Sequence, residues 1–245
     1  MKYLLAALAL GLAAMQPASA QVNLNPPYGD PLYKAFTVFS PDAPDPDAMR
    51  DDVVVVFHGF TSAVPNGTYK RVRKAFRETH TVIGINYDPL DIERTLAFLD
   101  AVEEKWLKGR RTVVLGTSFG AFMADVYGHR IGAQKIVLLN PVTEPARQLS
   151  GYVGKQASNN RRAQSFLVEA AALERYTSLN ANELDGISRL VVLSADDNVL
   201  DFRDALEVFA GKKKTITIVY PKGGHTLDLR KHPARAFIVE FVSSN

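Results

Sequence analysis

The sequence has 245 residues and contains no cysteine. This absence excludes a disulfide framework, and it also excludes the lipid-modified cysteine that anchors bacterial lipoproteins. The stability of the fold must therefore come from a packed core. Hydrophobic residues make up 47% of the chain, which is enough for one domain with a sizeable core.

The sequence also lacks a strong charge of either sign, because its net charge is only +3. Its basic clusters are short and adjoin helical or turn sequence, so we interpret them as solvated faces; they lie at residues 70–74, 161–162 and 212–214. No cluster is interleaved with aromatic residues as in a nucleic-acid-binding motif. The sequence therefore predicts no nucleic-acid partner.

The apolar run at residues 4–14 has about eleven residues, which is too few to cross a bilayer. It follows Lys2 and precedes Ala18-Ser19-Ala20, a small-residue cleavage site. This pattern predicts a signal peptide over residues 1–20 and a mature chain that begins at Gln21. We expect an exported bacterial protein, periplasmic or secreted, with no stable membrane anchor after cleavage. The sequence leaves the oligomeric state open.

Strand and helix patterns alternate along most of the mature chain. Continuous apolar runs, which are typical of strands covered on both faces, alternate with amphipathic helical segments. The alternation predicts an α/β fold with a doubly wound, mostly parallel sheet, the α/β-hydrolase fold, in a single domain over residues 21–245. Residues 142–185 interrupt the rhythm, and we expect them to form a small cap insertion with two or three short helical stretches.

A nucleophile motif stands at the centre of the chain. The apolar run at residues 113–115 ends in Gly116-Thr117-Ser118-Phe119-Gly120, which is G-x-S-x-G between a strand and a helix. The two glycines allow strand and helix to approach closely, and the turn exposes the Ser118 hydroxyl. The pentapeptide alone is also compatible with a plain strand-to-helix turn, so its context must decide.

The chain supplies an acid and a base in the order that this fold uses, serine, then acid, then histidine. The strand at residues 190–194 leads into Asp196-Asp197, and the strand at residues 216–220 leads into His225. All three groups therefore follow strand ends, where ligands bind in open α/β sheets. We favour Asp197 as the acid over Asp196, which stays an alternative. We also expect Asp201 to cap the next helix.

The remaining histidines are weaker candidates for the base. His80 and His129 lie at helix ends, where exposed histidines compensate the helix dipole, and His232 precedes the start of the last helix. His58 and Gly59 follow the first long strand, and we expect them to shape an oxyanion loop. The backbone N–H groups of Phe60 and Phe119 are the predicted oxyanion donors. The histidine and acid spacing does not favour a metal site.

Several of these motifs together resemble the bacterial YqiA/YcfP-type esterases of the α/β-hydrolase superfamily. The resemblance runs from residue 53 to the C-terminus and is carried by His58-Gly59-Phe60-Thr61-Ser62, G-x-S-x-G, Asn140-Pro141, Tyr152-Val153-Gly154, residues 197–203 and Gly223-Gly224-His225. It implies a carboxylesterase- or thioesterase-like activity without a cofactor, with Ser118, Asp197 and His225 as the triad. The chain departs from those cytosolic proteins in its leader and in Ala121-Phe122 after the elbow, so their substrate cannot be carried over to it.

The sequence as a whole predicts an exported serine hydrolase that cleaves a small-molecule carboxylic ester through an acyl-enzyme. The same triad could instead serve an acyltransferase, a thioesterase or an amidase. A catalytically silent envelope binding protein on this scaffold is a further alternative, because fold does not fix function. The cap mixes aromatic with basic and amide residues, so it is not distinctly like the lid of a lipase.

Overall fold

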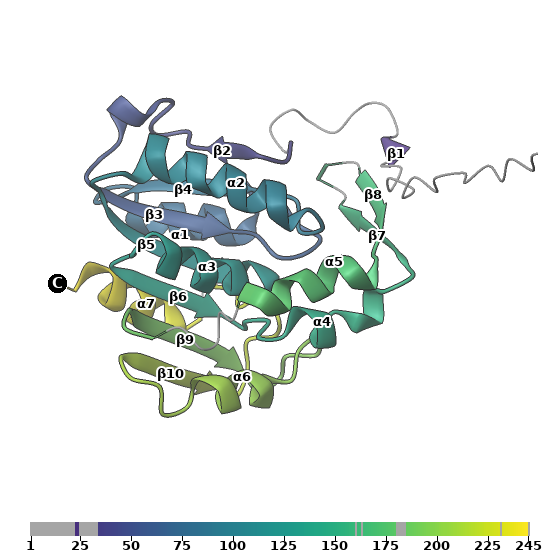
Figure 1. Ribbon diagram of the computed structural model, residues 1–245. Coiled ribbons are helices and arrows are strands. Elements are labelled where there is room, and N and C mark those ends of the chain that lie inside the picture. The colour runs from purple at the N-terminus through teal and green to yellow at the C-terminus, as the bar shows by residue number, and fades with distance from the viewer. Residues whose placement is uncertain are drawn as a thin grey trace, which may run out of the picture.

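The computed structural model describes residues 23–24, 34–159, 161–162, 164–179, 185–230 and 232–244. The predicted signal peptide lies outside these residues. Within them, seven strands form one sheet in the order β10-β9-β6-β5-β3-β4-β2, in which every pair is parallel except β2 and β4 (Figure 1). The strands are β2 (Thr37–Phe39), β3 (Asp52–Phe57), β4 (Thr81–Asn86), β5 (Arg111–Thr117), β6 (Lys135–Leu139), β9 (Ser188–Ser194) and β10 (Thr215–Tyr220). This arrangement confirms the predicted doubly wound sheet.

Helices cover both faces of the sheet because its central strands are apolar on both sides. Along β3, Val53, Val55 and Phe57 belong to one buried cluster, and Val54 and Val56 belong to the other. The first cluster includes α2 (Ile92–Val102), α3 (Phe119–Arg130) and α6 (Phe202–Phe209). The second includes α1 (Gly67–Phe76) and α7 (Ala234–Ser243). A strand buried on both faces is the pattern that the continuous apolar run indicates.

Polar side chains set the beginnings of three helices. Asn66, Asp91 and Asp201 each accept a hydrogen bond from a backbone N–H in the first turn of α1, α2 and α6 respectively. The prediction that Asp201 caps its helix is therefore confirmed. Helix α2 is regular to Val102 and continues as a π-helical turn over Glu103–Leu107.

The cap segment contains a hairpin that the sequence analysis missed. Short helical pieces are present as expected, namely α4 (Pro145–Gln148), α5 (Ala170–Glu174) and the 3₁₀ turns at Ser150–Tyr152 and Arg175–Leu179. Between them, β7 (Gln156–Asn159) and β8 (Gln164–Leu167) pair antiparallel, and β1 (Asn23–Leu24) adds a third strand beside β8. The two hairpin strands are short and mostly polar, so their sequence contains no apolar run that would predict a strand. Within them, Ala157 and Phe166 are the buried apolar residues.

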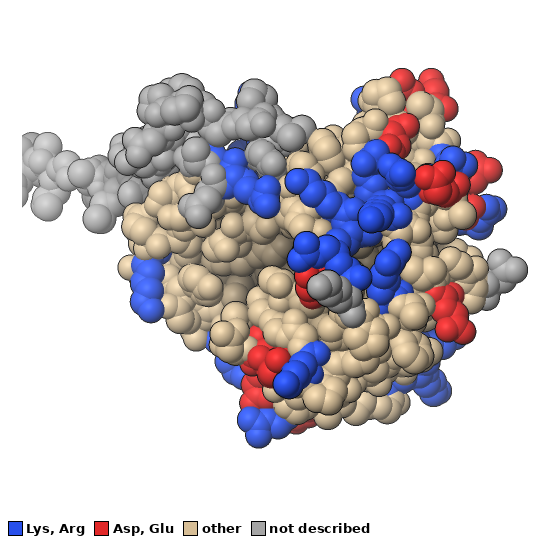
Figure 2. All heavy atoms as spheres, turned by 180° about the vertical axis from the view of Figure 1, so that it is seen from behind, with Lys and Arg blue, Asp and Glu red and all other residues tan. Residues whose placement is uncertain are grey.

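Basic side chains gather on the face covered by α1 and α7, as Figure 2 shows. The α1 cluster meets the expectation of a solvated face in part, because Arg71 and Arg73 form ion pairs with Asp228 and Asp42. The interpretation of residues 161–162 as solvated is wrong for Arg162, whose exposed fraction is 7%.

In the described part of the chain, no helix is both long and apolar enough to span a membrane.

Candidate active site

The predicted site residues lie at one edge of the sheet, where the parallel strands end. His58 and Gly59 directly follow β3, and Ser118 directly follows β5. Asp197 lies three residues after β9, and His225 lies in the loop after β10. Because parallel strands end at the same edge, His58 and His225, which are 167 positions apart in sequence, both lie there (Figure 1).

Ser118 occupies a tight turn between β5 and α3. Its φ of 58° and ψ of −128° lie outside the regions that side chains favour, so its backbone is strained. The flanking glycines make this turn possible. A Cβ on Gly116 would lie 1.9 Å from the Gly120 carbonyl oxygen, and a Cβ on Gly120 would lie 2.4 Å from the His58 carbonyl oxygen. The local geometry is therefore that of a nucleophile elbow and not that of a plain turn.

Asp197 and His225 form a direct hydrogen bond. The distance between His225 Nδ1 and Asp197 Oδ2 is 2.8 Å, and the Asp197 side chain is only 2% exposed. The other oxygen, Oδ1, accepts hydrogen bonds from the N–H groups of Val199 and Leu200. Asp196 points elsewhere and accepts from the Gly224 N–H at 2.8 Å. The geometry thus brings Asp197, and not Asp196, to the imidazole.

The protonation of this pair follows from its contacts. Burial raises the pKa of Asp197, but hydrogen bonds from His225, Val199 and Leu200 together outweigh that effect and hold the pKa below its usual value. A carboxylate can only accept, so Nδ1 of His225 carries the proton and donates it to this bond. With the Nδ1 proton in this bond, Nε2 is the ring atom left to accept a proton, as a general base requires.

The predicted oxyanion donors lie around Ser118. An added Cβ on Gly59 would be 3.6 Å from Ser118 Cβ, so the loop after β3 passes beside the serine. Phe119 is the first residue of α3, and its N–H therefore has no partner within the helix. The Phe60 ring packs edge-on against the Phe119 ring, with 5.7 Å between their centroids. The side chains of Phe60 and Phe119 are thus neighbours beside the elbow.

A cavity of about 550 Å³ opens at this edge and is lined by both Ser118 and His225. Among the described residues, His225 is the one acidic or basic side chain in its wall. Hydroxyl and amide groups from the loop after β3 and from the beginning of α1 form part of the wall, namely Thr61, Ser62, Asn66 and Thr68. Apolar groups from the cap and from the loop after β9 form another part, namely Leu149, Tyr152, Val199 and Leu200.

The other histidines lie outside this cavity wall. His232 receives a hydrogen bond from the Ala234 N–H and contacts the Lys222 carbonyl, and His80 contacts the Thr79 hydroxyl. The expectation that His129 is exposed is wrong, since its side chain is 8% exposed and contacts Asp125 and Arg189. Within the residues that the structure describes, no three His, Cys, Asp or Glu side chains form a possible metal site.

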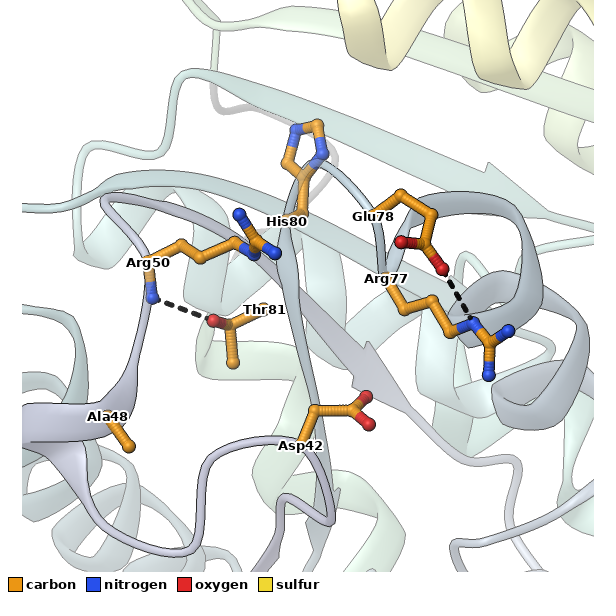
Figure 3. A pocket seen from close by; sticks show the side chains of 7 residues that line it. All are labelled: Asp42, Ala48, Arg50, Arg77, Glu78, His80 and Thr81. Atoms are coloured by element: carbon orange, nitrogen blue, oxygen red, sulfur yellow. Dashed lines mark hydrogen bonds and ion pairs between the residues drawn. The ribbon is translucent and has the colours of Figure 1, made fainter.

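A second hollow lies at the opposite end of β4, near its first residue, Thr81 (Figure 3). Its charged side chains are partly engaged with one another, because Arg77 pairs with Glu78 while Asp42 pairs with Arg73 beyond the hollow. The hydroxyl of Thr81 accepts a hydrogen bond from the Arg50 N–H. The described residues that line this hollow include no serine paired with a histidine base, so the elbow cavity is the candidate active site.

Two groups of supporting residues were not assigned a role by the sequence analysis. Asn140, which carries the family resemblance, donates from Nδ2 to the carbonyls of Gly224 and His225, both at 2.9 Å. Its Oδ1 accepts from the Ser194 N–H, so Asn140 ties the end of β6 to the loop that carries His225. Asn159 and Arg162 reach the loop after β3 from the cap hairpin. Their only sequence signal is a polar turn.

The sheet order, the elbow and the edge cavity together define the α/β-hydrolase fold. Similar solved structures include Est1E from Butyrivibrio proteoclasticus with ferulic acid bound (11% identity, TM-score 0.60), which is matched over 84% of this chain and 92% of that chain. A putative hydrolase from Agrobacterium vitis S4 has 13% identity and a TM-score of 0.62, over 83% and 89% of the two chains. Mouse alpha/beta hydrolase domain-containing protein 10 has 9% identity and a TM-score of 0.60, over 84% and 90%. These similarities show a shared fold.

Residues 53–239 match the uncharacterised protein family UPF0227. Because the match spans most of the chain, the chain belongs to this family, and the resemblance identified from its motifs is confirmed. A comparison with curated proteins finds no match.

Proposed function

We propose that this protein is an exported serine hydrolase that cleaves carboxylic esters. The observation that carries the proposal is the hydrogen bond between His225 Nδ1 and Asp197 Oδ2 at the cavity that Ser118 also lines. A strained serine at an elbow, an imidazole and a buried carboxylate are the parts of a nucleophilic triad. The similarity to several esterase structures supports the same choice of chemistry.

In the proposed reaction, His225 Nε2 removes the Ser118 proton while Oγ attacks the ester carbonyl. Asp197 keeps the imidazole in its productive tautomer and stabilises the imidazolium that forms. The N–H groups of Phe60 and Phe119 bind the negative oxygen of the tetrahedral intermediate. The imidazolium then protonates the leaving alcohol, and an acyl-enzyme remains on Ser118. Water, activated by His225, attacks this ester and releases the acid.

The cavity wall favours an uncharged ester as the substrate. An ionised group on the substrate would find no opposite charge among the described wall residues, and its desolvation would go uncompensated by them. The apolar side chains of Leu149, Val199 and Leu200 suit a short or medium acyl chain, and the hydroxyl and amide groups suit a neutral polar alcohol.

Kinetics with a p-nitrophenyl ester series tests the proposal. The protein should hydrolyse uncharged esters, and Ser118→Ala should reduce kcat by several orders of magnitude while the protein stays folded. Hydrolysis that survives in Ser118→Ala would contradict a serine mechanism. A folded protein that cleaves thioesters or amides instead would support the thioesterase or amidase alternative. One that hydrolyses no acyl compound would support the acyltransferase or silent-binding alternative.

Export is the second part of the proposal, and it is supported by Lys2, the apolar run at residues 4–14 and the Ala18-Ser19-Ala20 site. The mass of the protein recovered from the periplasm or the medium should correspond to a chain that begins at Gln21. A chain recovered from the cytoplasm with Met1 intact would contradict it.

A further inference from the structure

The tip of the cap hairpin holds the loop of residues 58–62, which we call the His58 loop. Asn159 Nδ2 donates a hydrogen bond of 2.7 Å to the Ser62 carbonyl. Arg162 Nη2 donates a hydrogen bond to the Tyr87 carbonyl at 2.6 Å and lies 3.2 Å from His58 Nε2. His58 and Arg162 are 1% and 7% exposed, so this contact takes place inside the protein.

The contact with Arg162 determines which nitrogen of His58 carries the proton. A guanidinium only donates, so His58 Nε2 must be the acceptor. The Tyr87 N–H points to the same nitrogen at 3.5 Å, and the two rings stack with 4.3 Å between centroids. In a neutral imidazole the proton then resides on Nδ1. Burial and the Arg162 charge lower the pKa of His58 to about 3, which keeps the ring neutral.

The Nδ1 proton fixes the peptide between Gly59 and Phe60. His58 Nδ1 lies 2.8 Å from the Gly59 carbonyl oxygen, which also accepts from the Ser62 N–H at 3.1 Å. The carbonyl and the N–H of a trans peptide point in opposite directions. Two donors on the Gly59 carbonyl therefore set the direction of the Phe60 N–H, and Gly59 is the residue that passes beside Ser118.

We propose that Arg162 is a positioning residue that acts through His58 on the Phe60 N–H, and that the cap hairpin thereby sets the oxyanion site. This inference rests on the proposed function, because the Phe60 N–H has a role as oxyanion donor only in the proposed reaction. The energetic cost of burying the Arg162 charge supports this role. Arg162 is a buried cation with no ion pair among the described residues, and its Nε is buried without a hydrogen-bond partner there. A residue that merely fills space would not require a buried charge.

The test compares Arg162→Met with Arg161→Met in the protein without its leader. Arg161 lies on the same turn and donates to the Pro65 carbonyl, but it has no hydrogen bond with His58, so its variant controls for loss of charge at the hairpin tip. We expect Arg162→Met to lower kcat by about 10- to 100-fold with little change in KM, because loss of a whole oxyanion donor costs about 100- to 1000-fold. Arg161→Met should keep kcat within about twofold of the wild type.

A second readout does not depend on turnover. In ¹⁵N-labelled wild-type protein, His58 should give the signals of a neutral ring protonated at Nδ1, and Arg162→Met should give mixed or exchanging tautomers. Arg162→Lys keeps a donor for Nε2, so it should recover most of the kcat and the single tautomer. If Arg162→Met does not fold, the wild-type spectrum still decides, because a His58 ring protonated at Nε2 would overturn the positioning role.

The outcomes separate the two proposals. A wild-type protein without serine-dependent ester turnover would contradict the proposed function, and the positioning role would be contradicted with it. An active wild-type protein overturns only the positioning role in either of two cases: Arg162→Met matches Arg161→Met in kcat, or His58 keeps its Nδ1 proton without Arg162.

Discussion

Asp197 Oδ2 and His225 Nδ1 lie 2.8 Å apart, while Asp196 turns to the Gly224 N–H in the same loop. The two adjacent carboxylates thus have different partners, and a matched pair of variants separates their roles. Asp197→Asn should lower kcat by about 10⁴-fold, since an amide favours the wrong tautomer of the imidazole. Asp196→Asn should lower kcat less than about tenfold, because it weakens only a contact to the loop. Equal losses in the two variants would show that Asp197 has no special role.

His58 should make the stability of the protein depend on pH. Its pKa is lowered from 6.5 to about 3 by burial and by Arg162. Between these pH values the unfolded chain binds a proton that the folded protein excludes. The stability that neutral His58 contributes is therefore fully present above about pH 6.5 and is lost as the pH falls toward 3. From pH 7 to pH 5 this group alone should remove about 2 kcal/mol of unfolding free energy.

Urea unfolding at the two pH values, in the wild type and in His58→Gln, measures the contribution of His58. The variant is expected to be less stable overall, but its loss between pH 7 and pH 5 should be smaller by about that amount. An identical pH dependence in both proteins would mean that His58 is not held neutral.

Much of this architecture could be predicted because the relevant signals are local. The run at residues 53–57 is apolar on both faces, and the glycines at 116 and 120 mark a turn that tolerates no Cβ. The cap could not be predicted in the same way. Its hairpin strands carry few apolar residues, and their pairing depends on contacts with β1 and with the His58 loop.

The misread residues have a common physical cause. Arg162 and His129 are polar side chains that became buried through partners distant in sequence, His58 and Tyr87 for the former and Arg189 for the latter. Sequence patterns place polar residues at the surface unless a partner is known, and these partners meet only in the folded chain. The sequence favours Asp197 over Asp196 as the acid, and the structure supplies the contact of Asp197 with His225.

Gly120 should not tolerate a side chain. In Gly120→Ala the new Cβ would meet the His58 carbonyl at 2.4 Å, which is backbone and cannot rotate away. We expect a loss of stability of about 1–3 kcal/mol or more, together with a loss of ester turnover. Gly151→Ala is the matched control because its Cβ would meet no atom within 4 Å. Thermal unfolding compares the two; equal melting temperatures would show that the elbow is looser than described.

Asn140 should support both the fold and the position of His225. Removing its amide in Asn140→Gly preserves the positive φ of 41° but leaves the Gly224 and His225 carbonyls and the Ser194 N–H without this partner. We expect a loss of about 1–3 kcal/mol in unfolding free energy and a lower kcat. Urea unfolding and ester kinetics measure the two effects, and unchanged kcat in the variant would mean that the loop keeps its place without Asn140.

The buried ion pair of Arg189 and Asp125 should matter more than exposed pairs. Its Nε and Oδ1 atoms lie 2.8 Å apart, and the side chains are 0% and 2% exposed. Asp125→Ala leaves a buried cation without its carboxylate and should cost about 3–5 kcal/mol. Asp100→Ala, which removes an exposed partner of Arg130, should cost less than about 1 kcal/mol. Denaturant unfolding of the two variants gives the comparison, and similar costs would contradict it.

Covalent labelling with a fluorophosphonate tests the central claim, that Ser118 is an activated nucleophile, most directly. The reagent should add one phosphonyl group to the folded protein, and peptide mapping should place it on Ser118. Ser118→Ala should stay unlabelled, and Asp197→Asn should react far more slowly than the wild type. A folded wild-type protein that takes up no label, or that carries the label on another residue, would contradict the account.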